Sequence, residues 1–277
     1  TFAVGWQDLR PLDHWLDVFS DIESKYPQIP STEIAAQVTC SMLVALTHRQ
    51  PRHPNTERWT QLATSIINAP GERGYRVMLA AYLGIFYTWT GPFIRGKELM
   101  ILVQPLLTDD LSPMIQILWQ CFMGLHSGSR TAHTESLPAA EEARRISRDS
   151  GINAMDNVID LIGIHSCLAA GNVQAAESWL ADLDALRDTG QIDYAVYYQC
   201  LSLIAIQKGK TRLASEHMHK AIEAAQQHGN LLGEGAEYVG LAQLLFETGH
   251  PELAREQLAR GWGVSQRIRS ELLEYLC

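Results

Sequence analysis

The second half of the chain repeats one short motif three times at a nearly constant interval. Gly171, Gly209 and Gly249 are each followed five residues later by alanine and nine residues later by leucine or methionine. The copies start 38 and then 40 residues apart. A fixed period of this size in a helix-forming chain predicts a stacked array of helical hairpins, in which each unit buries its apolar surface against its neighbours.

Two more turn glycines, Gly91 and Gly128, extend the pattern toward the N-terminus. The residue seven positions before the glycine is small in four of the five copies, and so is the residue five positions after it. Small residues are required where two antiparallel helices cross closely, and glycine in the turn supplies the positive φ that ends the first helix. The residues at these positions are Gly84, Cys121, Ile164, Ser202 and Ala242 before the turn, and Gly96, His133, Ala176, Ala214 and Ala254 after it.

The period predicts an all-α fold, a right-handed α-solenoid superhelix of about six antiparallel helical hairpins with repeats of about 40 residues. No stretch alternates with a period of two, so no sheet is expected. Ser31 or Thr32 is expected to cap a helix, and Pro138 predicts a kink or a bulkier connection near residues 130–138. A single array is predicted over residues 1–277, with a partial repeat at 1–30 and repeats at 31–73, 74–110, 111–152, 153–190, 191–230 and 231–277.

Composition limits the compartment and the classes of partner. The net charge of −9 argues against direct nucleic-acid binding by this segment, since such binding rests on clustered Lys and Arg. The five cysteines are scattered, which indicates thiols in a reducing compartment. No apolar run approaches the roughly 18 residues that span a bilayer, so we expect a cytoplasmic protein with no membrane contact. The chain starts at Thr1 and both ends fall inside a repeat, so we expect a fragment of a longer protein.

Motifs for catalysis and metal binding are incomplete or missing. Residues 91–98 match seven positions of a Walker A loop, but Glu98 stands where Ser or Thr should hold magnesium, and its charge would repel phosphate. His217 and His219 lie about 200° apart on a helix, so one helix cannot direct both to one metal. No nucleophile, general-base or zinc motif occurs. We therefore expect no enzyme activity, no metal and no cofactor.

Three segments resemble a known repeat family. Residues 87–91 (Tyr-Thr-Trp-Thr-Gly), residues 244–254 (Leu-Leu-Phe-Glu-Thr-Gly-His-Pro-Glu-Leu-Ala) and the Ala-Ala-Glu-x-x-Leu helix at 175–180 resemble the tetratricopeptide (TPR) pattern, stretched from about 34 to about 40 residues. Hairpins of this length resemble the superhelical sensor domain of MalT-type regulators, LuxR-family transcription factors of the STAND ATPase class, over roughly residues 31–277. The resemblance implies flanking nucleotide-binding and DNA-binding modules, and an array that binds the inducer and takes part in self-association.

The concave face is the expected binding surface, because the first helix of each hairpin lines the inner groove of such arrays. The register of the turn glycines places glutamines, histidines and aromatic side chains there, which suits a ligand that stacks and forms hydrogen bonds, such as a sugar, a nucleotide or a peptide. The aromatic candidates could instead pack in the core between repeats. His165 could instead be a groove or core residue whose hydrogen bonds are made within the protein. The candidate residues are Trp89, Phe122, His126, His165, Gln199, Gln207, Gln243, Phe246 and Glu247.

Two non-enzymatic functions fit these observations. The leading hypothesis is a sensor and protein-interaction domain of a multidomain bacterial signal-transducing transcription regulator, which binds an inducer or a partner on its concave face. The alternative is a TPR-like scaffold that binds a peptide or a partner protein and takes no small-molecule ligand. An all-α enzyme ranks below both, because no catalytic set of residues is present in the sequence.

Overall fold

The computed structural model describes residues 8–25, 31–128, 133–185 and 193–277. Within these ranges the regular secondary structure is helical and contains no strand, so the expected all-α fold is confirmed. The helices are α1 (Pro11–Lys25), α2 (Thr32–His48), α3 (Thr56–Asn68), α4 (Arg73–Thr90), α5 (Phe93–Val103), η1 (Gln104–Leu106), α6 (Pro113–Gly128), α7 (His133–Ser150), α8 (Asp156–Ala169), α9 (Val173–Ala185), α10 (Tyr194–Gln207), α11 (Thr211–His228), α12 (Leu231–Glu247), α13 (Pro251–Ile268) and α14 (Glu271–Leu276).

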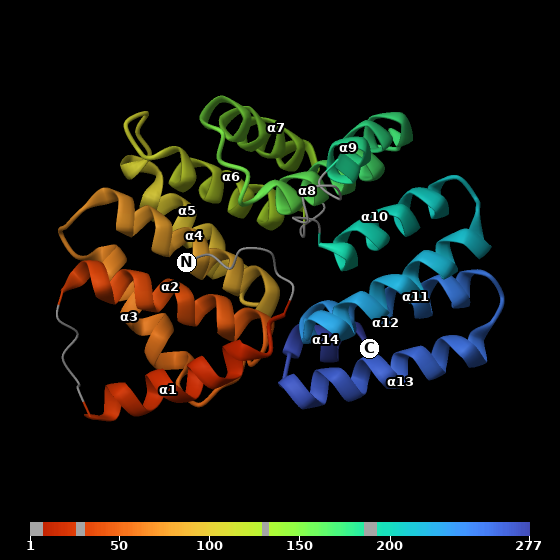
Figure 1. Cartoon of the computed structure of the whole chain (residues 1–277), viewed down its shortest axis with the longest axis horizontal. Coiled ribbons are helices and arrows are strands. Elements are labelled where there is room, and N and C mark those ends of the chain that lie inside the picture. Colours follow the sequence, from red (N-terminus) through yellow and green to blue (C-terminus); the bar gives the residue numbers. More distant parts are fainter. Residues whose placement is uncertain (1–7, 26–30, 129–132, 186–192) are drawn as a thin grey trace.

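Successive helices pack as hairpins, with α2 against α3, α4 against α5, and so on to α12 against α13. Figure 1 shows these hairpins following one another around an arc, from α2 and α3 in orange, over α6 to α9 in green, to α12 and α13 in blue. Ser31 caps α2, because its hydroxyl oxygen accepts a hydrogen bond from the amide of Ile34 at 3.2 Å. One of the two predicted capping residues is therefore confirmed.

Small residues are buried where the helices of a hairpin cross. Between α10 and α11, the hydroxyl of Ser202 donates to the carbonyl oxygen of Ala214 at 2.9 Å, so the two predicted small positions lie directly against each other. Between neighbouring hairpins, Gly84 of α4 lies so close to the ring of Phe122 of α6 that an added Cβ would be 2.3 Å from it, so the close contact at this predicted small position is with the next hairpin. The turn glycines with the predicted positive φ are Gly91, Gly171, Gly209 and Gly249.

Gly128 departs from this pattern. It is the last residue of α6 and lacks a positive φ, so the prediction of a left-handed turn glycine is wrong there. A Cβ at Gly128 would lie 3.3 Å from the hydroxyl of Ser136, which donates to the carbonyl oxygen of Gly124 at 2.8 Å. Gly128 therefore allows α7 to approach α6 closely. Pro138 lies inside α7, and residues 129–132, where part of the predicted kink or bulky connection falls, are outside the described residues.

The arc closes on itself, because its last helices contact its first ones. α12 packs against α2, and α14 against α4. Arg49, which follows α2, donates to the carbonyl oxygen of Gly229 after α11 and forms an ion pair with Asp13 of α1. Trp89 of α4 packs against an apolar cluster from α11 to α14. We call these contacts between N-terminal and C-terminal helices the seam, and they convert the solenoid into a ring (Figure 1).

The crossing at Gly84 leads to a stability prediction. Gly84→Ala forces a methyl group into the buried ring of Phe122, so we expect the free energy of unfolding to fall by about 1–3 kcal/mol. Gly263→Ala in the middle of α13 is the control, because an added Cβ there meets no atom within 4 Å and helix propensity favours alanine by roughly 0.5–1 kcal/mol. Urea unfolding measures both changes. Equal effects of the two substitutions would contradict the close crossing.

Candidate functional site

The inner helices of all the hairpins meet around one central cavity. Its volume is about 170 Å³, far above the roughly 10–15 Å³ that one water molecule needs. Residues that lie more than 190 positions apart in the sequence, such as Val44 and Glu237, share its wall. The lining residues from α2, α4 and α6 are Val44, Thr47, His48, Tyr82, Ile85, Trp89 and Leu125. Those from α8, α10, α12 and their capping positions are Met155, Asn157, Val158, Leu161, Asp193, Ala195, Val196, Gln199, Asn230, Leu232, Gly233, Ala236 and Glu237.

Several polar groups in this mostly apolar wall already have structural partners. The carboxylate of Asp193 caps α10 by accepting hydrogen bonds from the amides of Ala195 and Val196. The side-chain oxygen of Asn230 caps α12 in the same way. Asn157 accepts a hydrogen bond from the backbone amide of Asp193 at 3.0 Å. These bonds fix the edges of the cavity, because each ties a lining side chain to the start of an inner helix.

Glu237 differs from the other polar lining residues. It is 4% exposed, and among the described residues its carboxyl group makes no hydrogen bond and no ion pair. Burial, with a smaller contribution from the negative charge of Asp193, raises the pKa of Glu237 to about 8. Burial also raises the pKa of Asp193, against the effect of its amide donors and of His228. The cavity therefore contains two carboxyl groups for which the charged form is costly.

His48 lies in the wall contributed by α2. Burial alone lowers its pKa to about 4, so the imidazole is neutral at physiological pH. No lysine or arginine is among the lining residues. The described wall therefore supplies no cation that could balance a charged carboxylate.

Two of the nine residues predicted from the sequence line the cavity, namely Trp89 and Gln199. Phe122 and His126 are buried between helices, where the ring of Phe122 lies against Gly84 and the ring of His126 lies against Gly96. The side chains that the structure leaves exposed outside the cavity are His165, Gln207, Gln243, Phe246 and Glu247.

The register of the turn glycines did not include several of the lining residues. It placed ligand contacts along the whole length of the inner helices, whereas the wall comes from the C-terminal halves of α2, α4 and α6 and from the N-terminal halves and caps of α8, α10 and α12, such as Asp193 and Asn230. It also omitted α2, which reaches the cavity only because the ring closes. One pattern could have identified Glu237, since an acidic residue in the middle of an apolar helix needs a partner or a function.

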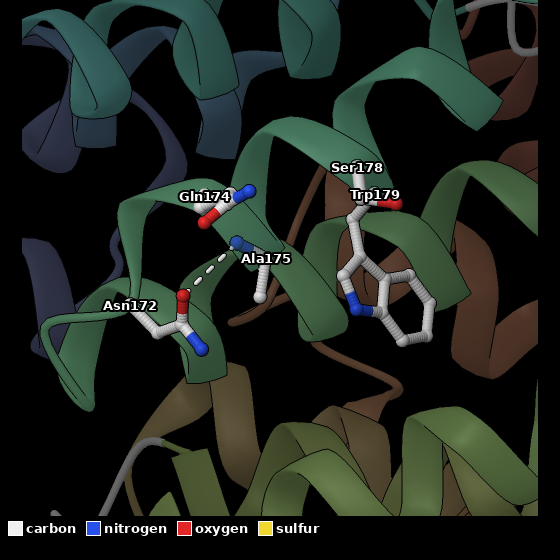
Figure 2. A pocket seen from close by; sticks show the side chains of 5 residues that line it. All are labelled: Asn172, Gln174, Ala175, Ser178 and Trp179. Carbon is white, nitrogen blue, oxygen red and sulfur yellow. Dashed lines mark hydrogen bonds between the residues drawn. The ribbon is translucent and has the colours of Figure 1, made fainter.

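A second hollow lies at the turn between α8 and α9 and is lined by Asn172, Gln174, Ala175, Ser178 and Trp179. Figure 2 shows that Asn172 and Gln174 lie near the start of α9, with the indole of Trp179 to one side. The side-chain oxygen of Asn172 accepts a hydrogen bond from the amide of Ala175 at 3.0 Å, so it caps this helix. The hollow is open to solvent and small residues form much of it, so the central cavity is the better candidate.

Other kinds of site receive no support from the described residues. They contain no group of three or more His, Cys, Asp or Glu side chains placed to hold a metal ion. None of their helices is long and apolar enough to cross a membrane. The cysteines are free thiols, and all are buried apart from the half-buried Cys277.

The fold and the cavity define a helical-repeat protein of the TPR-like class. No family model matches the chain, and no curated protein matches it. Among solved structures, the chain is similar to the crystal structure of a Rap protein complexed with Competence and Sporulation Factor, with a TM-score of 0.69. The alignment covers 95% of this chain and 74% of the Rap chain at 12% sequence identity. At this identity the likeness shows the shared helical-repeat fold.

Glu237 and His48, whose pKa values shift in opposite directions, contribute opposite pH dependences to stability. The pKa of Glu237 rises from 4.5 to about 8 on folding, so its contribution to stability is present in full below pH 4.5 and is lost as the pH rises through 8. The pKa of His48 falls from 6.5 to about 4, so its contribution is present above pH 6.5 and is lost as the pH falls through 4. Between pH 6.5 and 8 the contribution of Glu237 to stability falls, while that of His48 is nearly constant.

We expect Glu237→Gln to remove the fall in stability toward pH 8, leaving the variant more stable there by up to a few kcal/mol. Urea unfolding at intervals from pH 5 to 8.5 measures the two profiles. Glu247→Gln, which removes an exposed carboxyl group from the same helix, controls for the change in net charge. Parallel profiles for Glu237→Gln and the unmodified chain would show that Glu237 is not the buried acid.

Proposed function

We propose that this chain is a non-enzymatic binding module whose central cavity receives a segment of a peptide or partner protein. The observation that supports this best is the convergence of the inner helices on one cavity. A ligand held there would touch repeats from both ends of the chain. Ligand sites in proteins are typically concave and apolar with a few polar groups that fix orientation, and this wall has that composition.

Two further observations support a binding role. The similar Rap structure was determined with a bound factor, so a chain of this fold can hold a partner. In the described wall, the hydroxyl of Thr47 donates to the carbonyl oxygen of Leu43 in its own helix, and no serine or cysteine is among the lining residues. The cavity thus offers recognition groups and no activated nucleophile.

Filling the cavity tests this proposal. Ala236→Phe adds an aromatic ring to the cavity wall, whereas Ala259→Phe adds the same ring to an exposed position of α13. Peptides selected from a random heptapeptide phage library on the unmodified chain are titrated against both variants by calorimetry. We expect Ala236→Phe to weaken binding at least tenfold, or about 1.4 kcal/mol, and Ala259→Phe to leave it unchanged. Selected peptides that bind both variants equally would place the site elsewhere and refute the proposal.

The seam favours a second role, that of a sensor in a MalT-type regulator. A ligand that contacts both ends of the ring would bind the closed ring better than an opened one, and only such a difference in affinity can shift a conformational equilibrium. In this proposal the chain belongs to a longer signal-transducing protein with nucleotide-binding and DNA-binding modules. Opening of the seam would alter self-association or contacts with those modules.

Removal of Arg49 tests whether the seam is a separable element. Arg49→Ala leaves the carboxylate of Asp13 and the carbonyl oxygen of Gly229 without this partner, so we expect a loss of about 1–3 kcal/mol. Hydrogen exchange should rise at residues 8–13 and 228–233 and change little in α6 to α8. Arg212→Ala is the control, because Arg212 makes only an exposed pair with Glu216. Uniform acceleration over the whole ring would contradict a separate opening of the seam.

A further inference from the structure

The carboxyl group of Glu237 is a buried polar group that makes no hydrogen bond and no ion pair with the described residues. It comes from the second turn of α12, and the cap residue Asp193 at the start of α10 is near enough to raise its pKa electrostatically. Isolated buried charges cost several kcal/mol unless they are paired. An apolar residue at this position would remove that cost, so the acid lowers stability without any structural bond in return.

The cations around the cavity are engaged elsewhere. Arg49 of the seam binds Asp13 and the carbonyl oxygen of Gly229. Arg267 of α13 pairs with Glu234, one turn before Glu237 on α12. The other titratable groups that share or adjoin this part of the wall are His48 of α2, which burial keeps uncharged at neutral pH, Tyr82 of α4, and Asp193 and Cys200 of α10. His228 of α11 acts on Asp193. Among the described residues, the wall therefore offers no cation to pair with Glu237 in its charged form.

We propose that the cavity binds a protonated amine carried on an apolar group, with the carboxylate of Glu237 as its counter-ion. This inference rests on the proposed function, since it assigns the chemistry of the ligand in the same cavity. The amine comes either from the N-terminus of an apolar peptide or from a small alkylamine. Both present a compact ammonium group next to a hydrocarbon body, which the wall is suited to receive.

The wall discriminates against the other classes of ligand. An anion would find no cation in the described wall, and a neutral apolar molecule would leave the carboxyl group of Glu237 unpaired. The described residues do not provide the three ligands of a metal site. An ammonium group can donate to Glu237 and to the side-chain oxygen of Gln199, while Trp89 and Tyr82 provide aromatic surface in the same wall. These groups lie on three inner helices, so binding would join separate repeats.

Binding also changes the protonation of the site in a defined way. At pH 7 the carboxyl group of Glu237 is mostly protonated in the empty cavity, because burial raises its pKa to about 8. When the ligand enters as R–NH₃⁺, the carboxyl group releases its proton to solvent and remains as the carboxylate beside the ammonium ion. Up to one proton passes from the carboxyl group to solvent for each ligand bound, and no covalent bond forms between the ligand and the protein.

Matched probes test the charge preference directly. At pH 7.0, n-hexylammonium is compared with 1-hexanol and hexanoate, and leucyl-leucine amide is compared with its N-acetylated form, by calorimetry on the full chain. We expect at least one amine to bind tenfold or more tightly than its uncharged counterpart, and hexanoate to bind most weakly. Preference for hexylammonium indicates a small amine, and preference for the free dipeptide amide indicates a peptide N-terminus. Proton release is measured by repeating the titrations in buffers of different ionisation enthalpy.

Two isosteric variants identify the carboxyl group responsible. Glu237→Gln should abolish the preference for the amine and the proton release, while Glu234→Gln, on the same helix but outside the cavity wall, should keep both. Loss of fold is not the expected cause, since removal of the buried acid stabilises the chain above neutral pH. Equal binding of amine and uncharged probe, retention of the preference in Glu237→Gln, or no binding of either amine at 10 mM would overturn the inference. Uncharged probes that bind and are blocked by Ala236→Phe would leave the proposed function standing.

Discussion

Close packing of helices, both within a hairpin and between neighbouring hairpins, is the constraint on which the ring depends. At Ser202 and Ala214 the crossing is tight enough for a side-chain hydroxyl to reach the backbone of the facing helix, and at Gly84 a neighbouring aromatic ring occupies the space of a side chain. Helices that approach this closely have few allowed angles between them. The angle, repeated from hairpin to hairpin, accumulates into a curvature that returns α12 to α2 and α14 to α4. The enclosed cavity is a consequence of that curvature.

The cavity combines features that a purely structural interior would avoid. Most of its polar groups stabilise the ring, as Asp193 and Asn230 do by capping inner helices. Glu237 has no such bond, and its burial lowers stability above neutral pH. Binding and catalytic sites often contain a residue that lowers the stability of the fold, because its side chain is positioned to interact with a ligand or substrate. Glu234 on the same helix accepts a hydrogen bond from Arg267 and lies outside the cavity wall, whereas Glu237 lies in the wall and has no such partner among the described residues.

Much of the fold follows from the sequence, because repetition makes local rules visible. Glycines at a constant interval predicted the turns at Gly91, Gly171, Gly209 and Gly249, and the small residues Ser202 and Ala214 predicted one close crossing within a hairpin. The site was less accessible to such reasoning. Trp89 and Gln199 fall on the register of the inner face, but whether an inner residue meets solvent, core or cavity depends on the overall curvature. Closure of the ring joins residues at opposite ends of the sequence, and no short-range pattern encodes that contact.

The seam also limits how such a protein can change in length. An open solenoid tolerates the gain or loss of a repeat, because each unit contacts only its neighbours. Here Arg49 must contact Gly229, and Trp89 must contact the cluster of α11 to α14. A hairpin inserted or deleted between the N-terminal and C-terminal helices would displace these partners from each other. Variation among chains of this design should therefore be confined to the outer helices and turns. The number of repeats becomes a fixed property, as the number of strands is in a closed barrel.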